Sequence, residues 1–313
     1  MRKKRGSKLG CFFLVLLLAM LAVLAGGTGW VWSVWAQIHE PENEVEIPSG
    51  QDEIIVEEED KDLTNILILG LDQRGTEKAR ADTIIVLSIN NATKEMTMLS
   101  IPRDSRVEIP GRGLDKINHA YAYGGVSLMR ATVEKLLGVP VHHYVVTNFS
   151  GFVGLVDTLG GVTLDVERSI YVKAEQDYPA VKLEPGEQRL TGYEALAYVR
   201  FRKDSEGDFG RMRRQQQFLQ AVAKEVLQAK SLLKLPQLAR QATEYLRTDL
   251  PLTKALSLAQ QAASLNLDSV ETITLQGTGR TIGGVSYVVL DEAFLENVVQ
   301  TYLRPKDTDP VTH

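Results

Sequence analysis

The stretch from Val199 to Gln215 carries many of the side chains in this sequence that are suited to chemistry. It holds five arginines, three acidic residues and two glycines within seventeen residues. Arginine suits phosphate oxygens because its guanidinium group keeps its charge and can donate two hydrogen bonds to one anion. The stretch therefore indicates a phosphate-binding site. The alternative interpretation is a solvated basic loop ahead of an ordinary helix.

Two spacings in this stretch predict how its side chains are presented. Arg200 and Arg202 are two residues apart, so in an extended segment both side chains leave the same face. Asp208, Arg211 and Gln215 are spaced to lie on one face of a helix, and that face continues with apolar residues. We expect the first turn of this helix to project into the site.

Four more charged residues lie at the ends of predicted strands. Asp72 ends one strand and Asp82 begins the next, so antiparallel pairing would bring two carboxylates together. Two carboxylates suit a hard cation such as Mg²⁺, and the alternative is that Asp72 caps a turn and Asp82 begins a strand, which these two residues alone favour. Arg80 and Arg103 also lie at strand ends, where a lone arginine is usually a surface residue. Several arginines that converge repel one another and need an anion between them.

The elements that must position these residues alternate between strand and helix. Strands are predicted at 65–72, 81–89, 96–101, 141–147, 162–166, 270–275 and 285–290. Helices are predicted at 124–137, 149–159, from the glycines before Arg211 to about Lys230, at 232–245, 252–265 and 291–302. This order predicts an α/β fold, a three-layer α-β-α sandwich with a mixed central sheet, preceded by a single transmembrane helix.

The N-terminal part of the chain is organised by charge. Residues 1–10 carry five positive charges and form a basic cytoplasmic tail, and residues 11–36 carry none and are mostly apolar. The second segment is long enough to cross a membrane with the N-terminus inside, although a cleaved signal peptide is the alternative. Residues 37–62 contain eleven acidic residues and form an extracellular stalk. We expect residues 63–305 to form the folded domain and residues 306–313 a tail.

Composition and missing motifs narrow the function classes. The charge outside the first 62 residues sums to zero, which argues against nucleic acid as a partner. A single cysteine allows no internal disulfide. The motifs of serine hydrolases, P-loop NTPases, zinc proteases and dinucleotide enzymes are absent. His119, His142 and His143 lack the spacing of metal ligands, and we assign them no role.

Seven segments of the chain resemble the LytR-CpsA-Psr family of cell-wall glycopolymer transferases. In order, the matching segments are Asn65–Asp72, Ala81–Ile85, Met98–Asp104, Lys116–Gly125, Phe152–Val162, Leu190–Arg202 and Gly207–Gln215. The resemblance implies an enzyme that moves a glycopolymer from a polyprenyl-pyrophosphate carrier to a peptidoglycan hydroxyl and leaves a phosphodiester link. It also implies a single-pass membrane protein whose catalytic domain is extracellular.

The resemblance also implies roles for individual residues. Those that would contact the pyrophosphate are Arg80, Arg103, Arg200, Arg202, Arg211 and Gln215. Asp72 and Asp82 would lie at the Mg²⁺ site. Asp208 would lie beside them and orient an arginine or help to deprotonate the acceptor. These groups would neutralise the charge that develops on the transferring and leaving oxygens.

Two other functions remain open at the level of sequence. A hydrolase would release the polymer by attack of water on the same pyrophosphate. A membrane-tethered regulatory protein would hold a polyprenyl phosphate without turnover. The lipid tail of the carrier also needs a binding site. Two apolar helix faces could line a tunnel for it or could be ordinary hydrophobic core. These faces are Val126/Met129/Val133/Leu137 and Phe218/Leu219/Val222/Val226.

Overall fold

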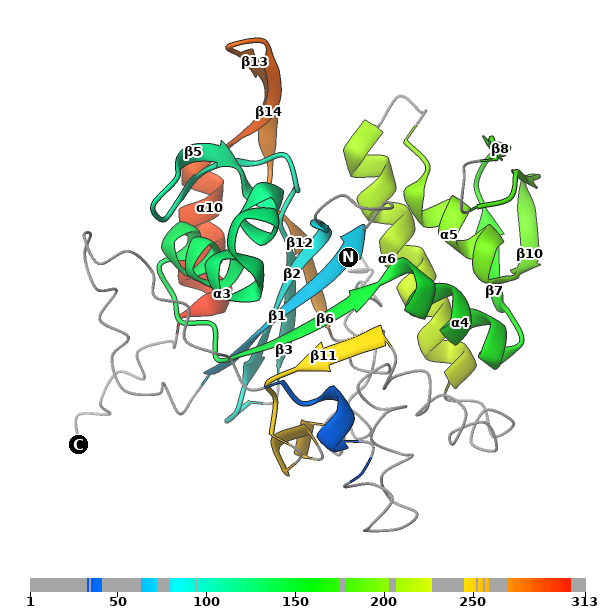
Figure 1. Ribbon diagram of the computed structural model, residues 1–313, viewed down its shortest axis with the longest axis horizontal. Helices are drawn as coiled ribbons and strands as arrows, with labels where there is room; N and C mark the ends of the chain where they lie inside the picture. Colours follow the sequence, from blue (N-terminus) through cyan, green and yellow to red (C-terminus); the bar gives the residue numbers. More distant parts are fainter. Residues whose placement is uncertain are drawn as a thin grey trace, which may run out of the picture. The chain divides into compact units, whose positions relative to one another are not determined.

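The structure is a computed structural model, and its described part forms two compact units (Figure 1). Unit 1 comprises Met1–Pro41 and Val145–Thr272, and unit 2 comprises Glu42–Tyr144 and Ile273–His313. The residues that the structure describes are 33, 35–40, 63–72, 79–93, 95–174, 178–202, 207–226, 245–251, 253–255, 257–258 and 270–304.

The centre of unit 2 is an antiparallel set of three strands. These are β1 (Leu63–Asp72), β2 (Arg80–Asn90) and β3 (Met96–Ser100). Their residues are mostly aliphatic and β-branched, which suits a strand covered on both faces. Leu67, Leu69 and Val86 are fully buried, so this sheet carries the core of the unit. The continuous apolar runs of the sequence are explained by this burial.

Further strands extend this sheet at both edges. The start of β6 (His143–Asn148) lies beside β1, and the end of β12 (Glu271–Thr274) lies beside β3. Asn65 fixes the first edge, because its amide donates to His142 Nδ1 at 3.0 Å and its carbonyl accepts from His142 at 2.9 Å. β6 runs in the same direction as β1, so the sheet is mixed (Figure 1).

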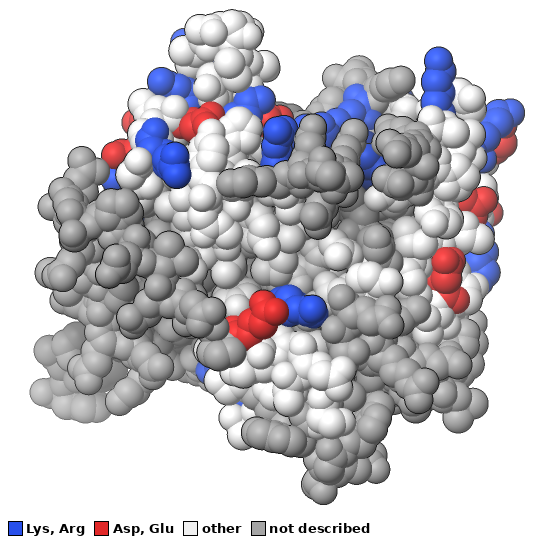
Figure 2. Space-filling model, in the orientation of Figure 1, with Lys and Arg blue, Asp and Glu red and all other residues white. Residues whose placement is uncertain are grey.

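Unit 2 adds helices and two hairpins to this sheet. The helices are α3 (Ile117–Leu137), α10 (Glu292–Val298) and the π-helical turn η3 (Val299–Leu303). The hairpins are β4 (Arg106–Ile109) with β5 (Gly113–Lys116), and β13 (Gly277–Ile282) with β14 (Val285–Leu290). The β13–β14 hairpin projects from the unit in Figure 1, and Figure 2 shows Lys and Arg groups gathered at its foot.

Unit 1 is built from helices packed with short strands. Its strands are the rest of β6, β7 (Val162–Val166), β8 (Ile170–Val172), β9 (Val181–Leu183), β10 (Gly186–Leu190) and β11 (Leu246–Thr248). Its helices are α4 (Phe149–Leu159), α5 (Gly192–Arg200) and α6 (Gly207–Val226). The rings of Phe152 and Phe218 stack at 4.4 Å and hold α4 against α6. A side chain on Gly192 would meet the Val153 carbonyl oxygen at 2.5 Å, so α5 needs glycine there to approach α4.

Local sequence signals explain where the helices of unit 1 begin and end. Asn148 caps α4 by accepting from the Gly151 amide at 2.9 Å, and Gly160 ends it in the left-handed conformation. Thr191 and Glu194 form a capping box at the start of α5. These caps confirm the predicted helix at 149–159 and give α5 a defined orientation.

Most predicted elements are confirmed, and two differ in a way that matters for the site. The helix expected from Gly124 is present, but a further helical stretch from Ile117 precedes it, and the two are joined at Gly124 and Gly125, whose backbone angles are not helical. The expectation that Arg200 and Arg202 lie in one extended segment is wrong, because Arg200 is the last residue of α5. The α/β class with a central mixed sheet is confirmed.

The described residues include no helix that is long and apolar enough to span a bilayer. Most of the predicted anchor at 11–36, and the predicted stalk at 37–62 apart from residues 37–40, lie outside the described residues. The predicted helices at 232–245 and 252–265 also fall largely outside them.

We expect Asp291→Ala to lower the free energy of unfolding by about 1 kcal/mol. The Asp291 side chain accepts from the Phe294 amide at 3.0 Å and so satisfies a free N–H at the start of α10. Denaturant unfolding of both proteins measures the difference. Asp291→Asn keeps an accepting oxygen and is the control, and an equal loss in that variant would contradict the capping role.

Candidate functional site

Asp82 lies at an irregularity in the pairing of β1 with β2. Gly70 pairs with Thr83 and Leu71 pairs with Ala81, so Asp82 is an extra residue on β2. Bulges of this kind turn a side chain away from the regular alternation of a strand and are frequent beside active sites. The Asp82 side chain is only 12% exposed. The bulge therefore gives this carboxylate a direction that regular pairing would not provide.

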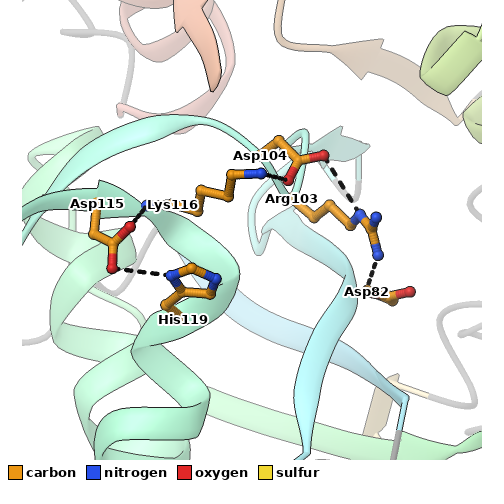
Figure 3. Close-up of polar contacts among 6 residues, drawn as sticks. All are labelled: Asp82, Arg103, Asp104, Asp115, Lys116 and His119. Carbon is orange, nitrogen blue, oxygen red and sulfur yellow. Dashed lines mark hydrogen bonds and ion pairs between the residues drawn. The ribbon is translucent and has the colours of Figure 1, made fainter. Parts of the chain in front are cut away.

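Arg103 follows β3 and faces this carboxylate (Figure 3). Its Nη1 donates to Asp82 Oδ1 at 2.5 Å, and its Nε lies 3.6 Å from Asp104 Oδ2. Asp104 in turn accepts from Lys116 Nζ at 2.8 Å. Two cations and two carboxylates thus alternate from the end of β3 to the start of α3. The prediction that Asp82 and Arg103 come together is confirmed.

The start of α3 holds this chain of charges in place. The Ile117 amide donates to the Ser105 carbonyl at 2.9 Å, and the Asn118 amide donates to the Arg103 carbonyl at 3.2 Å. The first amides of a helix have no partner within the helix, so these two bonds satisfy them. They tie Arg103 and Lys116 to one rigid element.

A second polar cluster lies on the next turn of α3. Asp115 Oδ2 accepts from His119 Nδ1 at 2.9 Å and from the Tyr123 hydroxyl at 2.8 Å, and Asp115 Oδ1 accepts from the Lys116 amide at 2.7 Å. Partial burial opposes ionisation of Asp115, but these hydrogen bonds outweigh it and lower its pKa below the ordinary 3.8. The hydrogen bond to Asp115 raises the pKa of Tyr123.

We expect Asp115 to make unfolding more sensitive to acid. Because its folded-state pKa lies below 3.8, its stabilising contribution is present above that pH and is lost as the pH falls through the folded-state pKa. Asp115→Asn should therefore flatten the stability profile below pH 3.8. Thermal unfolding as a function of pH measures this effect. A profile as steep as that of the unsubstituted protein would contradict it.

Arg80 and Asp72 lie at the ends of neighbouring strands, as predicted. Their backbones are partners in the β1–β2 register, and the Arg80 side chain is exposed. Arg80 also lies close enough to Tyr123 for its charge to lower the pKa of that hydroxyl in part. The side chain of Asp72 lies outside what the structure describes. Unit 2 therefore gathers Arg80, Asp82 and Arg103 around the β1–β2 ends and α3.

Unit 1 holds the remaining predicted residues at the ends of two helices. Arg200 ends α5 and places its guanidinium carbon 5.0 Å from the centre of the Tyr178 ring. Arg202 follows two residues later and is half-buried. Arg211 is 2% exposed on α6, and Gln215 lies half-buried one turn on. Asp208 lies in the first turn of α6, and its side chain is outside the described set.

One face of α6 runs from polar to apolar residues, as the spacing in the sequence predicts. Beyond Arg211 and Gln215 it continues with Phe218 and Val222, which are both fully buried. The helix therefore changes from polar to apolar along one face. The tunnel hypothesis stays a prediction, since these residues and the buried Met129, Val133 and Leu137 of α3 also fit ordinary core.

Arg214 is a buried arginine that the sequence did not single out. It is 2% exposed, donates from Nη2 to the Phe201 carbonyl at 2.6 Å, and lies 5.3 Å from the Phe201 ring centre. It thus fixes the residue between Arg200 and Arg202. The sequence could have indicated that Arg214 points toward the same region as Arg211, because Arg214 is three residues later and lies on the same side of the helix.

The magnesium site at Asp72 and Asp82 stays a prediction. Among the described residues there is no group of three His, Cys, Asp or Glu side chains that could hold a metal alone. Mg²⁺ is usually held by one or two carboxylates, water and substrate phosphates, and the Asp82 carboxylate at the β2 bulge is of the type that such a site needs. Lys116, Asp104 and His119 lie near Asp82 and Arg103 and were not predicted as site residues, although all three stand in segments that resemble the family.

The fold and these clusters define a class of protein. It is a mixed α/β protein in which arginines and carboxylates gather at strand ends and helix ends, an arrangement suited to binding phosphorylated ligands. The LytR_cpsA_psr family matches residues 35–303, and the chain belongs to this family.

Relatives of known structure or name resemble most of the chain. The polyisoprenyl-teichoic acid–peptidoglycan teichoic acid transferase TagU of Oceanobacillus iheyensis is 35% identical over 294 residues, which cover 90% of each chain. The crystal structure of Bacillus subtilis TagV is 34% identical, with a TM-score of 0.66, and covers 77% of this chain and 96% of that one. A structure of TagT bound to LI-WTA is 35% identical, with a TM-score of 0.63, and covers 82% and 97%.

Proposed function

We propose that this protein is an extracytoplasmic phosphotransferase that moves a glycopolymer from a polyprenyl-pyrophosphate carrier to a peptidoglycan hydroxyl. The observation that carries the proposal is the Arg103–Asp82 pair at the bulged end of β2, in a chain 35% identical to a teichoic acid transferase over 90% of both lengths. The name of that relative supports a polyisoprenyl-linked teichoic acid as the donor and peptidoglycan as the acceptor.

The reaction exchanges one ester of phosphorus for another. The acceptor oxygen attacks the phosphorus next to the sugar, and the bond from that phosphorus to the bridging oxygen breaks. Polyprenyl phosphate leaves, and the hydroxyl proton passes to a base, a role for which Asp208 is our candidate. The products are polyprenyl phosphate and a phosphodiester between glycopolymer and peptidoglycan.

The residues of the chain contribute position and charge. We assign binding of the pyrophosphate oxygens to Arg80, Arg103, Arg200, Arg202, Arg211 and Gln215. Asp72 and Asp82 would hold a magnesium ion, which would neutralise charge on the pyrophosphate. The guanidinium of Arg103 is already oriented by Asp82 and Asp104, so it does not have to be ordered when charge develops. Such orientation favours the transition state over the ground state.

The placement of the protein in the cell belongs to the same proposal. A transmembrane anchor at 11–36 would leave residues 1–10 in the cytoplasm and place residues 63–305 outside. The acidic segment 37–62 would separate the domain from the membrane. We also propose that helices cover both faces of the central sheet in a three-layer sandwich. Proteolysis of intact and broken cells tests the orientation.

A product analysis tests the proposed reaction. The full-length protein is incubated with a labelled polyprenyl-pyrophosphate saccharide and Mg²⁺, with and without peptidoglycan fragments. We expect the label on peptidoglycan, joined through one phosphate, when the fragments are present. Release of free saccharide phosphate in both mixtures would instead identify a hydrolase. Binding of the carrier without any product would identify a regulatory protein.

A further inference from the structure

The two hairpins of unit 2 share a basic surface that the proposed reaction does not use. Its guanidinium groups belong to Arg106 on β4 and Arg280 on β13. Among the residues that the structure describes, neither of these two groups has a carboxylate partner. The nearby acids are already paired, since Asp104 accepts from Lys116 at 2.8 Å and Glu108 lies 3.0 Å from Lys135.

Tyr287 on β14 is the centre of this surface. The guanidinium carbon of Arg106 lies 5.8 Å from its ring centre, and Lys116 Nζ lies 5.9 Å from it. Arg280 is opposite Tyr287 in the β13–β14 register, so its side chain leaves the same face of the hairpin. Two cations therefore lie beside this ring, and Arg280 continues the basic groups along the β13–β14 hairpin.

The two hairpins are fixed to each other by the backbone. Ser105 and Val288 form a parallel bridge, and the Val288 amide donates to the Asp104 carbonyl at 2.9 Å. The bridge lies next to Arg103, whose neighbour Asp104 binds Lys116. A continuous series of contacts thus leads from Arg103 through Lys116 and Tyr287 to Arg280.

We propose that this surface, made of Arg106, Lys116, Arg280 and Tyr287, binds a polyanionic chain of phosphodiester-linked polyol units. Cations that repel one another at fixed positions are stabilised by anions between them, and guanidinium groups favour phosphate. A row of cations fits an anion that repeats, whereas a single phosphate would need one cluster. The inference rests on the proposed function, since a chain whose first phosphate is held at Arg103 continues over this surface.

Binding of soluble oligomers tests the surface without turnover. The full-length protein in neutral phosphatidylcholine nanodiscs is titrated with fluorescent glycerol phosphate oligomers of two lengths at several salt concentrations. We expect the longer oligomer to bind more tightly and its affinity to fall with salt. Arg106→Gln/Arg280→Gln should weaken binding of the longer oligomer by about tenfold, at about two- to fivefold for each cation removed.

A matched pair of substitutions controls for total charge. Lys173→Gln/Lys182→Gln removes two exposed cations at the β8–β9 hairpin and should change the affinity less than about twofold. Arg280→Gln alone, on an exposed strand, remains informative if the double variant fails to fold. Equal loss in the control pair, or equal binding of an uncharged dextran, would overturn the proposal.

The exposed apolar tip of the β13–β14 hairpin suggests an alternative partner for this surface, a lipid membrane. Ile282 and Val285 are 38% and 42% exposed, and such a tip could instead meet a lipid surface. If the soluble oligomers do not bind and Ile282→Ser weakens contact with anionic phosphatidylglycerol nanodiscs, the polyanion proposal is overturned. Oligomer binding in the absence of any transfer would refute the proposed function and leave this surface assignment standing.

Discussion

Arg103→Ala is expected to lower the rate of polymer transfer by about 10²- to 10³-fold. The arginine is held by Asp82 at 2.5 Å and by Asp104 at 3.6 Å, so its remaining N–H groups are oriented before substrate binds. Loss of one such oriented donor removes stabilisation that is strongest in the transition state. The rate is measured as labelled phosphodiester formed on peptidoglycan fragments at saturating donor.

Two further variants test whether the effect of Arg103→Ala comes from the lost guanidinium hydrogen bonds or from the lost positive charge. Arg103→Lys keeps the charge but loses the two-pronged hydrogen bonding, so we expect it to recover only part of the rate. Lys182→Ala removes an exposed cation of unit 1 and should leave transfer unchanged. Transfer by Arg103→Ala at the rate of the unsubstituted protein, with an unchanged unfolding midpoint, would remove Arg103 from the site.

Asp82→Asn is expected to lower transfer by a similar factor and to abolish its response to added Mg²⁺. The substitution keeps the shape of the side chain at the β2 bulge and removes the negative charge that a hard cation needs. Transfer is measured over a range of Mg²⁺ concentrations in both proteins. The unsubstituted protein should show a saturable increase, and the variant should stay flat.

The pairing of Asp82 with Arg103 offers a second explanation that the experiment must separate. If Asp82 served only to orient Arg103, the variant would be slow but would keep the Mg²⁺ dependence of the unsubstituted protein. Direct titration with Mn²⁺, followed by paramagnetic relaxation of water protons, adds a measurement that does not need turnover. Equal Mn²⁺ affinity in both proteins would refute the metal assignment.

The strands of unit 2 could be predicted from the sequence with small errors at their ends. Continuous apolar runs such as Leu67–Leu69 and Ile84–Leu87 favour buried structure, and their β-branched residues favour strands. The closeness of the β1 and β2 ends, and thus of Asp72 and Arg80, follows from antiparallel pairing of consecutive strands. The candidate arginines were identified by their positions at predicted strand and helix ends, and the resemblance implied their roles.

The small hairpins and the true start of α3 could not be predicted in this way. Arg106–Lys116 has few apolar residues, and its turn depends on glycines at positive φ. The sequence there shows neither the spacing of a helix nor the alternation of a strand. The first turns of α3 lack a side-chain cap and take their partners from Arg103 and Ser105 instead. A sequence window cannot detect bonds of this kind.

The sequence by itself determined which charged residues are present and the order of the helices and strands. The reason is that the spacing of hydrophobic residues and the residue types set local structure. Only the tertiary structure decided which charges meet. Asp82 is directed by a bulge, Lys116 reaches Asp104 across twelve residues, and Arg214 is buried against Phe201. These contacts form only after distant backbone segments have paired. A buried charged side chain is stable only when it has a hydrogen-bonding or charged partner, and here the fold brings that partner from elsewhere in the chain.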